Sequence, residues 1–167
     1  MTVRVQYKAF DAGQLIDSLR AYDPAVGAVV SFVGYVRDIN QGEFVSSLFL
    51  EHYPGMTERS LEKIIDNARA RWPLNKVEIV HRIGQLSVSD PIVFVGVSSQ
   101  HRQAAFDACA FIMDFLKTDA PFWKREDGAG GSRWVDARDS DRTAVERWQV
   151  ADQQAADKQA AGQPPQA

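Results

Sequence analysis

The chain has 167 residues, of which 45% are apolar and 25% are charged, so it can bury a sizeable core as one domain, with or without a small lobe. These values are ordinary for a soluble globular protein, and the formal net charge of −3 argues against a general nucleic-acid binder, which usually has a strongly basic domain. The single cysteine, Cys109, excludes an intrachain disulfide bond and a cysteine metal cluster.

The first half of the chain is predicted to contain several strands and two helices. Alternating apolar residues and capping signals predict, in chain order, a strand at 3–7, a short helix from Asp11 to Leu19, a long strand at 27–37, a strand at 44–53 and a capped helix at 57–72. The polar loop at 38–43 separates two of these strands, which we therefore expect to pair as a hairpin.

The second half is predicted to begin with two more strands and then a long helix. The expected elements are a strand at 77–83, a central strand at 92–97, a helix from His101 that stops at Pro121, a flexible loop at 127–132, a short strand at 133–136 and a short helix at 142–148. Residues 150–167 contain few large apolar side chains, so we expect a disordered tail there.

The order of these elements predicts the fold class. Strands and helices are mixed without strict alternation, which favours an α+β fold over a doubly wound sheet, with one domain at 1–149. The N-terminus has no apolar run of the signal-peptide kind and no stretch has the length of a membrane span, so we expect a cytoplasmic protein.

The helix that follows the central strand carries cations at both of its ends. Two serines, at 98 and 99, precede its start and could cap it, and His101 and Arg102 occupy that start, where the helix dipole favours an anion. Lys117 lies in the last turn, and a basic cluster wrapped in aromatic residues follows at 122–126. We infer a pocket for a phosphate-bearing small molecule, with lysines placed for chemistry on it.

Each of these residues also has a purely structural interpretation. Lys117 could be a solvated lysine paired with Asp114, three residues earlier on the helix. Arg37 could pair with a neighbouring acid at the end of its strand, and Arg138 could form a surface ion pair. Cys109 is predicted to be a buried hydrophobe, and the three histidines lack metal-ligand spacing, so we expect no metal.

Several long strings in the sequence resemble one known family. These strings are FVGYVR at 32–37, LEHYPGMTE at 50–58, HRIGQL at 81–86, SSQHR at 98–102 and FIMDFLKTDAPFWKRE at 111–126. They are similar, in the same order, to the large, catalytic subunit of molybdopterin synthase. The resemblance covers residues 27–148 and implies an α+β fold with mixed, largely antiparallel sheets and packed helices: a hammerhead-like α/β core plus a small β subdomain, with 1–149 as a single catalytic domain.

The resemblance implies a sulfur transfer without a cofactor. That family converts cyclic pyranopterin monophosphate (precursor Z) to molybdopterin, and the sulfur arrives as a C-terminal Gly-Gly thiocarboxylate on a small ubiquitin-like partner subunit. The family assembles as a homodimer of large subunits within a heterotetramer. No reactive cysteine is then needed in this chain.

The resemblance also implies roles for individual residues. Lys117 and Lys124 are similar to the two catalytic lysines of the family. The substrate-binding residues implied are Tyr35, Val36, Arg37, His101, Arg102, Lys117, Lys124, Arg125, Glu126 and Arg138. The competing hypotheses are a non-catalytic module that binds a phosphorylated small molecule or a partner's tail, and, less favoured, a phosphoesterase, for which the chain lacks a metal cluster or an obvious nucleophile.

Overall fold

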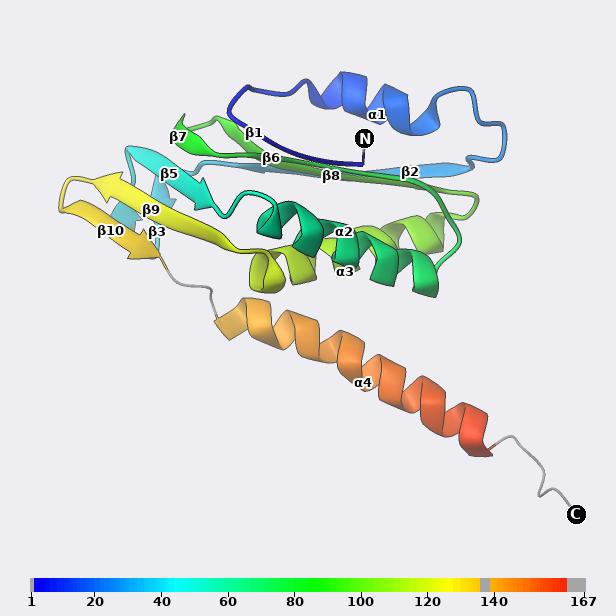
Figure 1. Cartoon of the computed structure of the whole chain (residues 1–167). Coiled ribbons are helices and arrows are strands. Elements are labelled where there is room, and N and C mark those ends of the chain that lie inside the picture. Colours follow the sequence, from blue (N-terminus) through cyan, green and yellow to red (C-terminus); the bar gives the residue numbers. More distant parts are fainter. Residues whose placement is uncertain (1, 136–138, 162–167) are drawn as a thin grey trace, which may run out of the picture.

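A computed structural model describes residues 2–135 and 139–161, with side chains as far as residue 154 (Figure 1). Its helices are α1 (Ala12–Arg20), α2 (Met56–Arg71), α3 (Arg102–Asp119) and α4 (Asp139–Ala161). Its strands are β1 (Val3–Gln6), β2 (Ala28–Tyr35), β3 (Ile39–Asn40), β4 (Glu43–Phe44), β5 (Ser47–His52), β6 (Leu74–Arg82), β7 (Gly84–Ser87), β8 (Pro91–Ser99), β9 (Phe122–Gly128) and β10 (Gly131–Val135).

The larger sheet has the strand order β1-β6-β8-β2 and separates two layers of helices. It is parallel only between β1 and β6, and α1 covers one face while α2 and α3 cover the other (Figure 1). Side chains alternate along β8, so Val93, Val95 and Val97 pack toward α2 and α3, whereas Phe94 packs toward α1. The expected central strand at 92–97 is confirmed.

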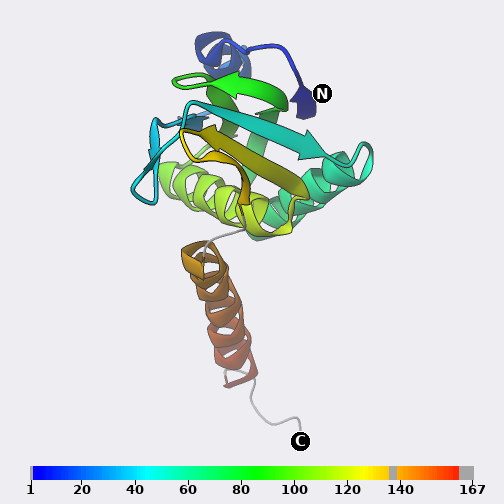
Figure 2. The same cartoon turned by 90° about the vertical axis from the view of Figure 1, so that its left-hand side faces the viewer.

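The smaller sheet has the order β10-β9-β5-β7 and is antiparallel throughout (Figure 2). Leu48 and Leu50 of β5 and Leu86 of β7 are buried on its inner face. One larger sheet covered by helices and one smaller sheet confirm the predicted α+β class, with mixed, largely antiparallel pairing.

The predicted hairpin between 27–37 and 44–53 is wrong. The first strand, β2, pairs with β8, and the second, β5, pairs with β7 and β9 in the other sheet. Residues between them form a separate small hairpin, β3–β4, which leads the chain from one sheet to the other. Alternation identifies a strand and its buried face, but it does not identify the strand's partner.

Helix α4 is longer than the sequence predicts. It runs over Asp139–Ala161, whereas we expected a helix only at 142–148 and disorder from 150. The residues after Val150 are mainly Ala, Gln, Asp and Lys, and the high helix propensity of Ala, Gln and Lys lets the helix continue without large apolar side chains. Residues 162–167 lie outside the described part of the chain.

Helix α3 leads directly into the smaller sheet. Only Ala120 and Pro121 separate it from β9, and this connection is held by Thr57 at the start of α2. The buried Thr57 hydroxyl donates to the Pro121 carbonyl at 3.2 Å and accepts the Tyr53 N–H at 3.1 Å. The end of α3 and the start of β9 are therefore tied to a third element. Within residues 2–135 and 139–161 we find no helical segment with the length and hydropathy of a membrane span.

Candidate functional site

Lys117 lies in the last turn of α3, where its amine contacts α4. Its Nζ atom is 3.6 Å from Oδ1 of Asp141, and its side chain is 46% exposed. The alternative pairing with Asp114 is wrong, because that carboxylate accepts hydrogen bonds from Arg147 at 2.6 Å and from the indole N–H of Trp148 at 2.8 Å. The neighbour of Lys117 is therefore an acid on another helix.

Lys124 lies on the inner face of the smaller sheet. In the register of β9 with β5 it is opposite Leu50, and Phe122, two residues earlier, stacks on the ring of His81 at 3.7 Å. The pKa of His81 is lowered to about 3, chiefly by burial; a hydrogen bond to the Arg82 carbonyl opposes the shift, and the nearby charge of Lys124 adds to it. A neutral imidazole therefore lies close to Lys124.

Arg125 points to the opposite face from Lys124, because side chains alternate along a strand. Its guanidinium lies 4.8 Å from the ring centroid of Phe49 and 5.9 Å from that of Trp134, and Nε is 3.3 Å from Asp127. We expected Lys124 and Arg125 to share one pocket. The structure separates them, and Arg125 stabilises the outer face of the sheet.

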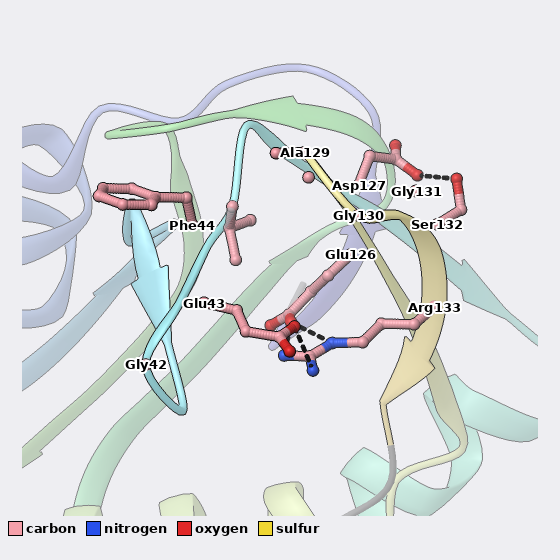
Figure 3. A pocket seen from close by; sticks show the side chains of 12 residues that line it. Gly42, Glu43, Phe44, Glu126, Asp127, Ala129, Gly130, Gly131, Ser132 and Arg133 are labelled. Atoms are coloured by element: carbon pink, nitrogen blue, oxygen red, sulfur yellow. Dashed lines mark hydrogen bonds and ion pairs between the residues drawn. The ribbon is translucent and has the colours of Figure 1, made fainter.

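Glu126 returns to the inner face and is held by two partners. Its carboxylate accepts a hydrogen bond from the Asn40 side-chain amide at 2.5 Å. It also forms an ion pair with the Arg133 guanidinium at 3.1 Å. Arg133 also contacts Glu43 at 2.7 Å, so this arginine joins β10, β9 and the β3–β4 hairpin (Figure 3). Glu43, Glu126 and Arg133 line a pocket of about 510 Å³, which the turn between β9 and β10 also lines.

The β3–β4 hairpin packs closely against β9 at Gly128. A Cβ atom at that position would lie 2.3 Å from the Phe44 carbonyl oxygen, whereas one at Gly130 would have nothing within 4 Å. We expect Gly128→Ala to displace the β3–β4 hairpin and to lower the free energy of unfolding by about 1–3 kcal/mol, as overpacking usually does. Urea unfolding and amide exchange at Phe44 check this, with Gly130→Ala as the matched control. Equal stability of the two variants would contradict it.

Tyr35, Val36 and Arg37 lie at the end of β2. Val36 is buried, whereas Tyr35 and Arg37 are exposed. Arg37 lines a second pocket of about 570 Å³ with Asp38 and Ser89. Arg37 is therefore an exposed residue that lines an open pocket.

His101 and Arg102 lie at the far end of α3 from Lys117. Fifteen residues separate Arg102 from Lys117, which corresponds to about 22 Å along a helix. The expected convergence of these cations on Lys117 is therefore wrong within one chain. His101 is the N-cap, and its side chain makes no capping hydrogen bond to the described residues. The preceding serines are part of β8, and one of them, Ser99, accepts the His101 N–H at 3.4 Å.

Arg138 lies outside the described residues.

Cys109 is not placed for chemistry. It is buried in α3, and burial raises the pKa of its thiol to about 11, so the reactive thiolate is disfavoured. Among the described residues, no group of three His, Cys, Asp or Glu side chains is arranged to hold a metal ion.

Two residues near the candidate lysines and Glu126 were not singled out from the sequence. Asp141 contacts Lys117 from α4, and Arg133 contacts Glu126 from β10. Both lie in charged stretches where many surface ion pairs are possible, so only the fold could identify their partners. The alternation of residues 122–128 would have separated Lys124 from Arg125, had that segment been identified as a strand.

Comparisons with known proteins agree over most of the chain. The MoaE protein family matches residues 5–119. The molybdopterin synthase catalytic subunit of Pseudomonas aeruginosa is 60% identical over 149 residues, which cover 89% of this chain and 99% of that protein.

Solved structures show the same fold. The molybdopterin biosynthesis MoaE protein from Burkholderia ambifaria MC40-6 is 50% identical, with a TM-score of 0.76, and the match covers 88% of this chain and 97% of that one. A chain in a protein–protein complex of subunits 1 and 2 of molybdopterin-converting factor from Helicobacter pylori 26695 has a TM-score of 0.68 and 19% identity, covering 81% of this chain and 91% of that one, a likeness in fold alone. The family match and the full-length identity together place this chain in the MoaE protein family.

Proposed function

We propose that this protein is the catalytic subunit of a molybdopterin synthase. It transfers sulfur from the C-terminal thiocarboxylate of a small ubiquitin-like partner subunit to precursor Z and so forms the dithiolene of molybdopterin. The observation that carries this proposal is the 60% identity to a molybdopterin synthase catalytic subunit over 99% of that protein's length. The reaction belongs to molybdenum cofactor biosynthesis, and the enzyme is a sulfurtransferase.

Lys117 and Lys124 are the catalytic residues of this proposal. They lie on consecutive elements, α3 and β9, which only two residues connect. The thiocarboxylate sulfur forms a C–S bond to a side-chain carbon of the pterin, from which an oxygen substituent leaves with a proton. Water then adds to the acyl carbon and cleaves the acyl C–S bond, so that the sulfur stays on the pterin and the partner leaves as its carboxylate. The lysine amines assist the proton transfers and stabilise the anionic intermediates. The sulfur arrives on the partner, so the buried Cys109 takes no part and no cofactor is required.

The proposed substrate-binding residues lie in several separate parts of the structure. Val36 and Arg37 line an open pocket and Tyr35 precedes them at the end of β2, while Glu126 is held in place by Arg133. His101 and Arg102 lie about a helix length from Lys117 of the same chain, so they reach a lysine pair only on a second copy. We assign Arg138 to the substrate from the resemblance alone, and Arg125, on the outer face, is the residue for which the geometry gives least support.

The partners follow from the same proposal. The Helicobacter pylori complex pairs two subunits of a molybdopterin-converting factor, and we expect this chain to bind its own small subunit and to form a homodimer within a heterotetramer. We place the assembly in the cytoplasm.

Reconstitution tests the proposed function. The protein is incubated with precursor Z and the thiocarboxylated small subunit, and molybdopterin is measured by fluorescence after oxidation. A small subunit that ends in an ordinary carboxylate is the control. Product that forms only with the thiocarboxylate supports sulfur transfer. Binding of both molecules without product would instead support a non-catalytic module and would sink the proposal.

A further inference from the structure

Helix α4 is anchored to the body of the protein by Trp148 together with ion pairs, one of which joins Arg71 of α2 to Asp152. The ring of Trp148 meets Trp72 at 5.7 Å and Phe111 at 5.5 Å, edge to face in both cases. Its indole N–H also donates to Asp114 at 2.8 Å, and Arg147 contacts the same carboxylate. This combination of ring packing and hydrogen bonding fixes α4 along its length and in its rotation.

The contacts show that α4 runs antiparallel to α3. Asp114 meets residues 147 and 148, while Lys117, one turn further along α3, meets Asp141, which is earlier on α4. Figure 1 shows α4 lying across the lower side of α3 and then extending away from the body. The anchor at Trp148 therefore determines where the first turn of α4 lies, and with it the position of Asp141.

The pair formed by Lys117 and Asp141 has little value for stability. The lysine side chain is 46% exposed and the aspartate 20%, and exposed ion pairs contribute only about 0–1 kcal/mol. A lysine has four rotatable side-chain bonds, however, and a carboxylate 3.6 Å from Nζ restricts the amine to the few rotamers that keep the pair. A reacting group must be held close to its productive geometry, so this restriction matters most for chemistry.

We propose that Asp141 is a positioning residue for Lys117, and that α4 acts as a strap that holds it there. The proposal rests on the role given to Lys117 in the proposed function. Asp141 touches neither substrate nor partner; it acts by holding the Lys117 amine. The C-terminal helix thereby becomes part of the catalytic apparatus of the α3–β9 junction.

The first test measures the amine directly and needs no activity. Purified protein is acetylated at low reagent concentration, and the modification rate of Lys117 is followed by mass spectrometry. We expect Asp141→Asn to raise this rate about two- to fivefold, the range of an exposed ion pair, while Lys124 keeps its rate. The matched control is Asp139→Asn, since Asp139 lies in the same turn and its side chain is 101% exposed. An unchanged rate at Lys117 in Asp141→Asn, or an equal rise in the control, would overturn the proposal.

The second test separates positioning from a merely structural role. In the reconstituted reaction, we expect Asp141→Asn to lower kcat by a factor of about three to ten and to leave the KM for precursor Z unchanged. Asp141→Glu restores a carboxylate and should recover both kcat and the slow labelling of Lys117. An unchanged kcat in the asparagine variant, or no recovery with glutamate, would show that the carboxylate does not position the amine.

A variant distant from the pair tests the strap. Trp148→Phe keeps an aromatic ring but removes the N–H that donates to Asp114. We expect Lys117 to be labelled faster in this variant too, with thermal unfolding measured to confirm that the protein is folded. A folded Trp148→Phe protein with wild-type labelling would refute the strap.

If Lys117→Ala retained activity, the role of the lysine in the proposed function would fail, whereas the labelling experiment would still report on the ion pair between Lys117 and Asp141.

Discussion

Replacement of Lys117 with alanine is expected to lower the rate of molybdopterin formation at least about 100-fold, the lower range for loss of a general acid–base group. The amine lies at the junction of α3 and β9, where Lys124 is the next candidate along the chain. Arg125 faces outward and the cations at the start of α3 are about 22 Å away along the helix, so these residues are not placed to replace it. The measurement is product formation in the reconstituted reaction under single-turnover conditions.

The variant should otherwise resemble the wild-type protein. The lost ion pair with Asp141 is exposed, so we expect the free energy of unfolding to change by less than about 1 kcal/mol, and binding of the small subunit to persist. Lys63→Ala, which removes an exposed lysine from α2, is the matched control and should keep full activity. Wild-type turnover by Lys117→Ala would rule out the catalytic role.

Acidification is expected to destabilise the fold through His81. Its pKa is about 3 in the folded state and 6.5 in the unfolded state, so between these values the unfolded chain binds the additional proton. The stability that the neutral His81 ring contributes is therefore fully present above pH 6.5, and it is lost as the pH drops toward 3. The loss between pH 7 and pH 4.5 is about 2–3 kcal/mol from this residue. The cause is the complete burial of the ring beneath Phe122, with the positive charge of Lys124 acting in the same direction.

Urea unfolding at pH 7 and pH 4.5 measures this loss. In His81→Gln the difference between the two pH values should shrink by about 2–3 kcal/mol, whatever the variant's stability at pH 7. His101→Gln, which replaces an exposed histidine, should keep the wild-type difference. The same pH dependence in all three proteins would show that carboxylates, and not His81, cause the acid sensitivity.

The sequence predicts the parts of this fold that depend on local pattern. The apolar spacing of α3 and the proline that follows it predict the helix and its end within about a residue, and the apolar run at 92–97 predicts the central strand. Capping of α1 by Asp11 was equally predictable, and its side chain accepts the Gln14 N–H at 3.1 Å.

The parts that depend on distant contacts were not predictable. Nothing in residues 27–53 indicates that β2 pairs with β8 and that β5 joins a different sheet, because the residues of a strand do not identify its partner strand. The position of Asp141 depends on a tryptophan that packs between α2 and α3. At the candidate site, the two lysines could be selected from the sequence, whereas the outward turn of Arg125 and the distance to Arg102 required the coordinates.

The hydrogen bond from Thr57 to the Pro121 carbonyl has a consequence for how the molecule works. This bond joins three elements at the two-residue link between Lys117 and Lys124, so it restrains the backbone of α3 relative to that of β9. The β3–β4 hairpin, in contrast, exposes Glu43 and Phe44 to solvent and contacts the smaller sheet through Glu126, Gly128 and Arg133. When a second subunit docks, we expect the backbone spacing of the two lysines to stay constant while the hairpin adjusts around the incoming chain.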